Sequence, residues 1–277
     1  MGSIAVVTGA SSGIGLAAAR ALAEAGWHVV ATARRPDAAD ALRQVAMEQQ
    51  AVEVRALDVT SDASVDACLG SVLADHGSVG LLVNNAGAGH RGTLEQLSIQ
   101  ALAQSMELNF LGVARVTKAV LPGMRAARAG RVITVTSMNG VVGMPFSDAY
   151  NASKFAVEGL MEGLAAVMRE FGVHISVLEP GPVRTAFFAN LGGAVGNITT
   201  DDPYRELIDR YNAMMADLGG GGQSPGSVAD LICQIAADPS PALRYQSSEQ
   251  ARSIAAQKLV DTTGRSILTA TGALLQP

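Results

Sequence analysis

The stretch Ile4-Ala5-Val6-Val7-Thr8-Gly9-Ala10-Ser11-Ser12-Gly13-Ile14-Gly15 sets the fold of this 277-residue chain. The apolar run before Thr8 is typical of a buried strand, and the helix-forming run Leu16–Ala25 follows the glycines. Glycines between a strand and a helix allow a tight turn and a close approach of the backbone to a ligand. Free N–H groups at the helix start then bind a pyrophosphate, helped by the helix dipole. The stretch predicts a dinucleotide-binding βα unit, with a plain tight turn as the alternative.

The composition is typical of a compact protein that acts on small molecules. Hydrophobic residues make up 48% of the chain and charged residues 16%, with a net charge of −5, so neither disorder nor nucleic-acid binding is expected. Cys68 and Cys233 are isolated and lack metal-site spacing, which predicts no disulfide, no metal and a reducing compartment. Neither an export signal nor an apolar run of about 18 residues is visible. We therefore expect a cytoplasmic protein without a membrane span.

Strand-like and helix-like segments alternate after the glycine turn, as in doubly wound α/β folds. The expected strands are Val29–Ala33, Val52–Leu57, Leu81–Val83, Arg131–Thr136, His174–Leu178 and Ala242–Gln246. The expected helices are Ala41–Gln49 with Asp37 as its cap, Ser64–Asp75, Ser98–Arg128 with an interruption at Pro122-Gly123, one that begins at Tyr150, and Ser227–Ala237. Because ligands of open α/β sheets bind outside the carboxyl ends of the strands, polar residues at those ends are candidate site residues.

The end of the second strand indicates which dinucleotide is bound. An acidic residue there accepts hydrogen bonds from a free ribose 2′-hydroxyl, whereas an arginine accommodates a 2′-phosphate. Ala33 offers no carboxylate, and Arg34 and Arg35 follow it, so the sequence predicts NADP(H). Two solvated arginines in a surface loop are the alternative. Asp58-Val59 is a candidate adenine-contacting loop after the third strand, although Asp58 alone fits a turn former equally well.

Tyr150 and Lys154 are candidates for proton chemistry. They lie one helical turn apart and project from the same helix face, although this spacing alone also marks many solvated helix faces. An ammonium beside a phenol favours the phenolate and lowers its pKa, so that Tyr150 can serve as acid or base. Ser137 stands just past the fifth strand, and the loop that follows is long enough to bring its hydroxyl near that of Tyr150. Asn109 lies among apolar residues and alone fits a satisfied core amide better than a catalytic group.

In this order the motifs strongly resemble those of the short-chain dehydrogenase/reductase family. The matches are T-G-x-x-x-G-x-G at Thr8–Gly15, N-N-A-G at Asn84–Gly87, Ser137, Y-x-x-x-K at Tyr150–Lys154 and P-G-x-x-x-T at Pro180–Thr185. Gly143–Ala156 and Gly181–Phe187 are similar to segments of the type 1 17β-hydroxysteroid dehydrogenases and the retinol-dehydrogenase-like reductases. The resemblance covers roughly residues 3 to 190, and the T-G-x-x-x-x-V-D-G-G ending of many bacterial ketoreductases is absent.

The resemblance implies an α/β fold of the Rossmann type. We expect one doubly wound domain, residues 1–277, with a parallel seven-stranded sheet in the order 3-2-1-4-5-6-7 and a helical substrate cap. Within it, residues 3–185 form the dinucleotide-binding and catalytic core, residues 186–225 a substrate lid, and residues 226–277 a C-terminal helix, the last strand and a tail.

The resemblance also implies roles for individual residues. Tyr150 would donate a proton to a carbonyl oxygen during hydride transfer, Ser137 would orient that carbonyl, and Lys154 would bind the nicotinamide ribose and lower the tyrosine pKa. The backbone carbonyl of Asn109 would hold a water that extends the proton path to solvent. The other cofactor contacts are assigned to Gly9, Ser11, Ser12, Gly13, Ile14, Gly15, Asn85, Ala86, Gly87, Pro180, Gly181, Val183 and Thr185.

Substrate choice is expected to reside in the lid, where apolar side chains precede a run of glycines. Its pocket candidates are Phe187 and Phe188, and Met138 and Met144 near Ser137 are further candidates. The nearby Tyr211, Met214 and Met215 each fit an ordinary core contact of an amphipathic helix better.

The favoured function is NADP(H)-dependent interconversion of an apolar, bulky ketone and its secondary alcohol. One alternative is an NAD-dependent alcohol or retinol-type dehydrogenase. Another is a non-catalytic dinucleotide sensor, against which the intact Ser137, Tyr150 and Lys154 argue. Gly159 and Gly163, on the helix that begins at Tyr150, permit close helix approach and predict a homodimer or higher homo-oligomer, unless they only ease packing on the sheet.

Overall fold

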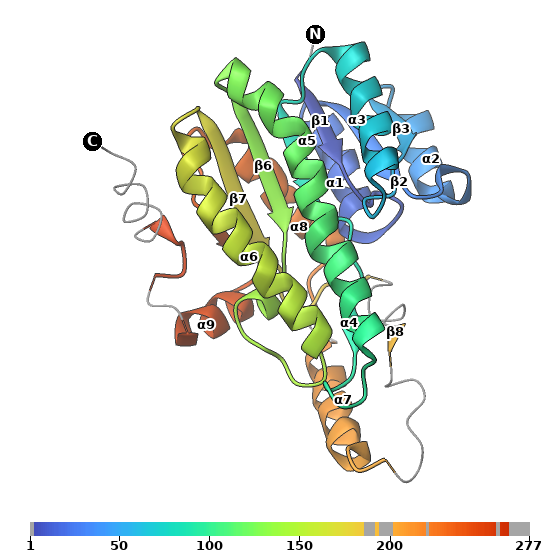
Figure 1. The fold of residues 1–277 in the computed structure, drawn as a ribbon, viewed down its shortest axis with the longest axis vertical. Coiled ribbons are helices and arrows are strands. Elements are labelled where there is room, and N and C mark those ends of the chain that lie inside the picture. Colours follow the sequence, from blue (N-terminus) through green and yellow to red (C-terminus); the bar gives the residue numbers. More distant parts are fainter. Residues whose placement is uncertain (1–2, 186–191, 194–201, 220–221, 259–260, 266–277) are drawn as a thin grey trace.

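A parallel sheet forms the centre of the protein (Figure 1). The computed structural model describes residues 3–185, 192–193, 202–219, 222–258 and 261–265. Within these residues, the seven strands of the sheet run in the order β3-β2-β1-β4-β6-β7-β9, and each pairs with its neighbours in parallel. The strands are β1 Ile4–Val7, β2 His28–Ala33, β3 Val52–Ala56, β4 Leu81–Asn84, β6 Gly130–Val135, β7 Val173–Glu179 and β9 Arg244–Gln246. The predicted strand number, direction and order are therefore confirmed.

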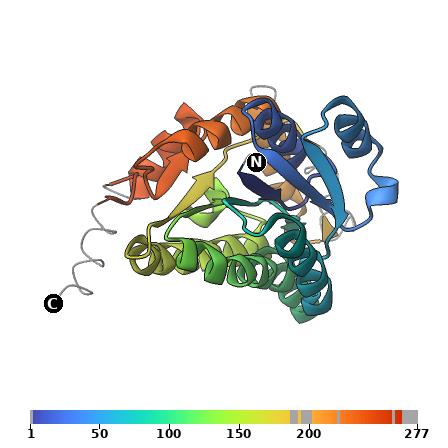
Figure 2. The same cartoon turned by 90° about the horizontal axis from the view of Figure 1, so that it is seen from above.

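Helices cover both faces of the sheet, so that its central strands are buried on two sides (Figure 2). One face packs against α1 Gly13–Glu24, α2 Asp40–Glu48 and α8 Pro225–Ala237. The other packs against α3 Asp62–His76, α5 Gly112–Ala127 and α6 Asp148–Arg169. Successive residues of a strand point to opposite faces. In β1, Val6 therefore joins one core and Val7 the other, which explains why this strand is apolar without alternation.

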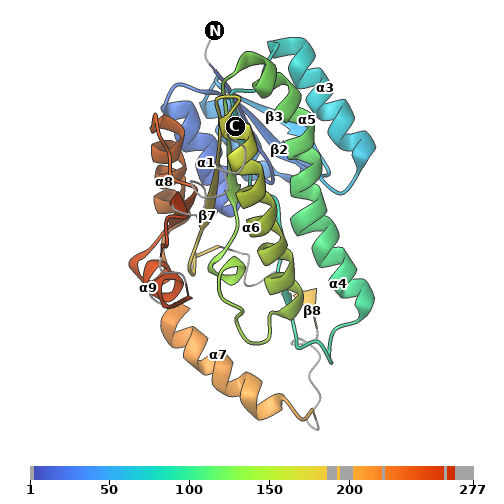
Figure 3. The same cartoon turned by 60° about the vertical axis from the view of Figure 1, so that its left-hand side comes forward.

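Further elements lie beyond the carboxyl ends of the strands (Figures 1 and 3). They are α4 Ile99–Met106, α7 Arg205–Gly219, α9 Glu249–Lys258 and a small parallel pair of strands, β5 His90–Arg91 and β8 Gly192–Gly193. Short helical turns cover Pro36–Ala38, Glu107–Leu111 and Met138–Gly140. No helix in the described part of the chain is long and apolar enough to span a membrane.

Two local predictions were wrong. Asp37 does not cap α2, because Pro36–Ala38 forms a separate turn and Ala39 precedes the first helical residue. The long helix is not interrupted at Pro122, which lies inside α5. Burial of Val120 and Met124 on either side of the proline favours the helix over the break. The irregularity lies earlier, where Glu107–Leu111 adopts a π-helical turn around the buried Asn109.

Candidate active site

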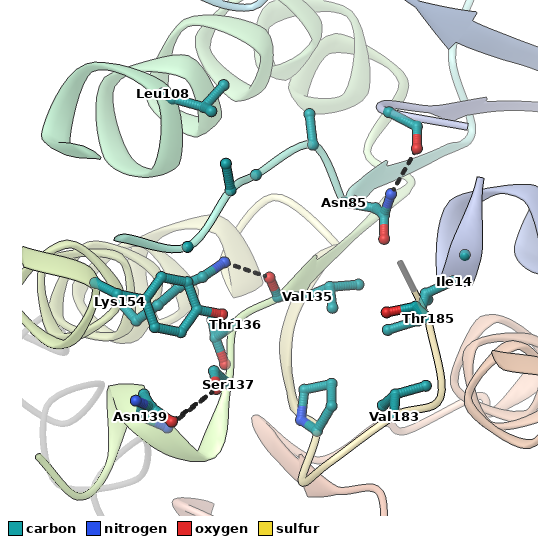
Figure 4. A pocket seen from close by; sticks show the side chains of 18 of the residues that line it. Ile14, Asn85, Leu108, Val135, Thr136, Ser137, Asn139, Lys154, Val183 and Thr185 are labelled. Atoms are coloured by element: carbon teal, nitrogen blue, oxygen red, sulfur yellow. Dashed lines mark hydrogen bonds between the residues drawn. The ribbon is translucent and has the colours of Figure 1, made fainter. Parts of the chain in front are cut away.

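A cavity of about 430 Å³ opens at the carboxyl ends of the strands and contains most of the predicted site residues (Figure 4). Those that line it are Gly9, Ser11, Ser12, Gly13, Ile14, Arg34, Asp58, Val59, Asn85, Ala86, Gly87, Ser137, Met138, Met144, Tyr150, Lys154, Pro180, Gly181, Val183 and Thr185. Gly15, Arg35 and Asn109 do not line it. Phe187 and Phe188 lie outside the described residues, as do the side chains of Met214 and Met215.

The glycine turn packs directly against the end of β4. Gly9 has a φ of +66°, and a Cβ on it would lie 2.8 Å from the Cα of Ala86. The hydroxyl oxygen of Thr8 accepts hydrogen bonds from the backbone N–H groups of Asn85 (2.9 Å) and Ala86 (3.0 Å). The side-chain amide of Asn85 donates in return to the backbone oxygens of Thr8 (2.9 Å) and Gly9 (3.0 Å). The asparagine after β4 therefore fixes the turn after β1.

The first turn of α1 is suited to an anion. Its N-cap residue, Ser12, makes no side-chain capping hydrogen bond, and no acidic residue occupies the first turn. The backbone N–H groups there lack a side-chain acceptor, and the helix dipole favours negative charge at this point. Gly13 has a φ of +58° and lines the cavity. Because glycine has no side chain, its backbone forms the cavity wall at this point. These features fit the pyrophosphate of a dinucleotide.

The two arginines after β2 differ in position. Ala33 is buried at the strand end, and Arg34 lines the cavity beside Asp58. Arg35 precedes the turn Pro36–Ala38 and does not reach the cavity wall. The side-chain and backbone hydrogen bonds from Thr60, together with the charge of Arg34, hold the pKa of Asp58 below its usual value. Of the two arginines, Arg34 is thus the one that lines the cavity.

Ser137, Tyr150 and Lys154 line the same cavity as Arg34 and the first turn of α1. Ser137 follows β6, and its hydroxyl oxygen accepts a hydrogen bond from the N–H of Asn139 (3.1 Å; Figure 4). Tyr150 and Lys154 lie on the first turns of α6. The Lys154 ammonium donates to the backbone oxygen of Val135 (3.0 Å) and lies 5.6 Å from the centre of the Tyr150 ring.

The expected lowering of the Tyr150 pKa by Lys154 is corrected by the structure. Burial raises the pKa of Tyr150 to about 12, and a hydrogen bond with Ser137 offsets only part of this rise. Burial also lowers the pKa of Lys154 to about 8, while the charge of Glu158 raises it. The Lys154 ammonium is directed to a backbone carbonyl rather than to the phenol, so the desolvation of both groups dominates. Tyr150 is therefore a protonated phenol at neutral pH.

Asn109 stabilises the wall of the cavity from behind. Its amide nitrogen donates to the backbone oxygen of Ala88 (2.9 Å) and the Ser153 hydroxyl (3.1 Å), and its amide oxygen accepts from the N–H of Ala88 (3.0 Å). Ala88 itself lines the cavity. The π-helical turn thus directs one fully buried side chain to both the segment after β4 and helix α6.

A buried charge cluster behind Lys154 escaped the sequence analysis. Arg244 on β9 forms ion pairs with Glu158 (2.5 Å), with Glu179 at the end of β7 (3.0 Å) and with Glu162. Glu158 is 5% exposed and Glu179 is 1% exposed. Burial, with the charge of Glu179, raises the pKa of Glu158 to about 7. Glu158 lies one helical turn after Lys154, so its place on the same helix face as Lys154 could have been recognised from the sequence. Its partner Arg244 is far away in the sequence, so the ion pair could not.

The cavity also contains residues that the sequence analysis did not assign to it. His90 and Arg91 of β5 line it, as does Tyr211 of α7, for which a core contact had been the preferred interpretation. A cluster with the spacing of metal ligands, His28, Glu53 and His76, does occur among the described residues, but none of the three lines the cavity. Glu53 there accepts a hydrogen bond from Arg55 (2.8 Å).

Comparisons with known proteins agree on one family. The family model for short chain dehydrogenases matches residues 3–194. Human retinol dehydrogenase 8 is 38% identical over 283 residues, covering 98% of this chain and 89% of that protein. Mouse 17-beta-hydroxysteroid dehydrogenase type 1 is 36% identical over 276 residues, covering 96% of this chain and 80% of that protein.

Solved structures with the same fold hold either dinucleotide. A short-chain dehydrogenase from Streptomyces avermitilis has a TM-score of 0.82 at 32% identity, covering 99% of this chain and 97% of that one. A variant of actinorhodin polyketide ketoreductase with NADPH has a TM-score of 0.75 at 29% identity (88% and 95% covered). A short-chain dehydrogenase/reductase from Burkholderia phymatum in complex with NAD has a TM-score of 0.79 at 27% identity (92% of each covered).

We predict that replacing Arg244 with methionine destabilises the fold in a pH-dependent manner. Removing one partner of a buried ion pair costs about 3–5 kcal/mol of unfolding free energy, because the remaining charges stay desolvated. Without Arg244 the pKa of Glu158 rises further above its unfolded value, so the folded state binds more protons than the unfolded state and stability falls as pH rises. The difference in unfolding free energy between wild type and variant should be largest above pH about 7 and should become smaller at acidic pH.

Urea denaturation of wild type and Arg244→Met between acidic and alkaline pH measures this effect. Arg252→Met is the matched control, because Arg252 pairs with Glu249 at the surface and should cost less than about 1 kcal/mol. An Arg244→Met protein as stable as the control at alkaline pH would show that the cluster does not hold α6 against β9.

Proposed function

The chain belongs to the short-chain dehydrogenase family, and from that premise we propose that it is an NADP(H)-dependent oxidoreductase that interconverts an apolar, bulky ketone and its secondary alcohol. The observation that carries the proposal is the meeting of Ser137, Tyr150 and Lys154 in the same cavity as the uncapped start of α1. A proton donor and a dinucleotide site are thereby within reach of one substrate.

The proposed chemistry divides between cofactor and protein. A bound nicotinamide cofactor supplies or accepts the hydride. Tyr150, a protonated phenol because burial raises its pKa to about 12, donates its proton to the ketone oxygen and recovers it in the reverse reaction. The Ser137 hydroxyl polarises the carbonyl and holds the phenol by a hydrogen bond. Lys154 keeps a positive charge near the phenol, which stabilises the phenolate left after proton donation.

The proposed cofactor contacts follow the cavity wall. The turn Ser11–Gly15 and the start of α1 would hold the pyrophosphate, and Arg34 the 2′-phosphate. Asp58, Val59 and the backbone of Asn85–Gly87 would lie along the adenosine. Pro180, Gly181, Val183, Thr185 and Lys154 would hold the nicotinamide and its ribose. Arg35 has no contact in this scheme, because it does not reach the cavity.

The proposed substrate class rests on the apolar wall near Ser137 and on the relatives. Met138 and Met144 line the cavity on this side, and methionine side chains adapt to irregular apolar ligands. The relatives are named for retinol and for 17-beta-hydroxysteroids, both of which are bulky and mostly apolar.

Both cysteines are free, which supports our proposal of a reducing, cytoplasmic location.

A panel of ketones with NADPH tests the function directly. Ketone-dependent loss of the NADPH absorbance is the expected result, with bulky apolar ketones favoured over acetone. A protein that binds NADPH but turns over none of the ketones, nor the corresponding alcohols with NADP⁺, would instead be a dinucleotide sensor. A protein that oxidises retinol with NAD⁺ in preference to NADP⁺ would be the retinol-type dehydrogenase, which the human relative at 38% identity makes the second candidate.

We predict a preference for NADPH that depends on Arg34. A hydrogen bond to a charged group contributes about 1.5–3 kcal/mol, which corresponds to a preference of about ten- to a hundredfold. In the double variant Ala33→Asp with Arg34→Ala, the new carboxylate repels a 2′-phosphate and accepts from a free 2′-hydroxyl. The ratio of kcat/KM with NADPH to kcat/KM with NADH should therefore fall to about one or below one. Arg35→Ala is the control and should leave the ratio unchanged, whereas equal use of both cofactors by the wild type would refute the assignment.

We also propose a homodimer in which α6 pairs with its symmetry mate. A Cβ at Gly159 or Gly163 would meet no atom within 4 Å, so these glycines do not serve packing on the sheet. Phe155, 38% exposed, and Val167, 42% exposed, continue the same row at one-turn spacing. The row is thus apolar and shallow, and it is open at the two glycines, while the Lys258 ammonium lies 4.4 Å from the centre of the Phe155 ring at its start. Such a row suits a close helix–helix contact.

We predict that Gly163→Arg converts a dimer into a monomer, because the long charged side chain would stand between the paired helices. Light scattering at micromolar concentration measures the mass of both proteins. Gly70→Arg, also at an open glycine but on α3, which α5 separates from α6 (Figure 1), should stay dimeric. A wild-type monomer would remove the proposal.

A further inference from the structure

At one wall of the cavity a cation and an aromatic ring line the cavity, and a second aromatic ring packs against the first. The ring of Phe146, in the loop before α6, meets the ring of Tyr211 on α7 edge to face at 5.5 Å. The guanidinium of Arg91 on β5 lies 5.8 Å from the centre of the Tyr211 ring. Arg91 and Tyr211 both line the cavity, next to Met144 and Ser147. This wall therefore lies on the substrate side, beside the start of the helix that contains Tyr150.

The backbone at this wall is strained. Phe146 has a φ of +58°, a left-handed conformation that costs a residue with a side chain about 1–3 kcal/mol and persists only where the surroundings fix it. The hydrogen bond from the N–H of Gly92 to the backbone oxygen of Phe146 (2.9 Å) and the contact with Tyr211 provide that restraint. Such strain is concentrated at ligand-binding sites, where it holds side chains in position.

The charge at this wall is not neutralised within the described structure. Arg91 is half-buried, and among the described residues no carboxylate lies within ion-pair distance of it. The neighbouring His90 has a buried Nδ1 with no hydrogen-bond partner among those residues. The acidic residue that lines the cavity, Asp58, lies beside Arg34 at the adenosine end. A half-buried cation therefore lines this part of the cavity without a carboxylate partner among the described residues, and the residue before it has a buried, unpaired ring nitrogen.

We propose that Arg91, with His90 and Tyr211, binds a carboxylate on the substrate, at the end of its apolar body that lies away from the reacting carbonyl. The inference rests on the proposed ketone reductase function and narrows its substrate class to keto acids with an apolar skeleton. The planar guanidinium suits the two oxygens of a carboxylate and remains charged at every physiological pH. The Tyr211 ring supports the guanidinium from one side and leaves its N–H groups free for the ligand.

A matched pair of ketones tests the proposal. The probes are a benzylacetone that carries a carboxylate on its ring and the methyl ester of the same compound. With NADPH, the wild type should favour the acid over the ester by about ten- to a hundredfold in kcat/KM, mainly through KM, because the acid gains charged hydrogen bonds. Arg91→Leu should remove this preference, because it lowers kcat/KM for the acid far more than for the ester. Arg91→Lys should retain part of it.

Arg125→Leu is the charge-matched control, because Arg125 is exposed on α5 and away from the cavity. No acid preference in the wild type, or an equal loss for acid and ester in Arg91→Leu, would overturn the proposal, since the latter indicates a structural role. Turnover of the ester tests the ketone reductase function separately. If neither probe is reduced, calorimetry of the acid with NADP⁺-saturated protein still decides: binding weakened about tenfold or more by Arg91→Leu supports the site, and unchanged binding refutes it.

Discussion

The hydroxyl of Thr8 accepts two backbone hydrogen bonds from the segment after β4, and this contact sets the geometry of the whole cavity. Parallel pairing places the ends of β1, β4 and β6 at the same edge of the sheet. The Thr8 contact then fixes how the backbone leaves two of those strands, so the glycine turn and the Asn85–Gly87 segment lie in direct contact and line the cavity together. Ser137, after β6, continues the same edge. A dinucleotide site and a proton donor therefore share one cavity because their strands are neighbours in one sheet.

Helix α6 contains Tyr150 and Lys154, and contacts on two of its sides fix its position. Toward the cavity, Lys154 donates to Val135 at the end of β6, and the amide of Asn109 bonds to Ser153. Behind it, Arg244 links Glu158 to Glu179 across β9 and β7. Burying these charges costs solvation energy, so the cluster specifies position more than it adds stability. The last strand of the sheet thus contributes to the placement of a helix nearly a hundred residues earlier.

The sequence predicted the elements of the fold because its signals were local. The apolar strands, the glycine turn and the one-turn spacing of Tyr150 and Lys154 can be recognised in short windows, and the sheet order followed from the resemblance. Properties that depend on burial were not accessible in the same way. The Tyr150 pKa was expected to fall with Lys154 nearby, but desolvation raises it, and no local pattern reports how deeply a side chain is buried. Arg244 and Tyr211 reach the site from distant segments, so only the folded structure reveals their roles.

The most direct test of the account is the turnover of Tyr150→Phe with NADPH and a ketone that the wild type reduces. Only the proton donor is removed, so kcat should fall by at least about a hundredfold, the range of general acid catalysis, while the Kd for NADPH stays within about twofold. Unfolding midpoints of both proteins show whether the variant retains the fold. A variant that folds, binds NADPH and keeps kcat within about tenfold of the wild type would contradict the role of Tyr150 and the mechanism built on it.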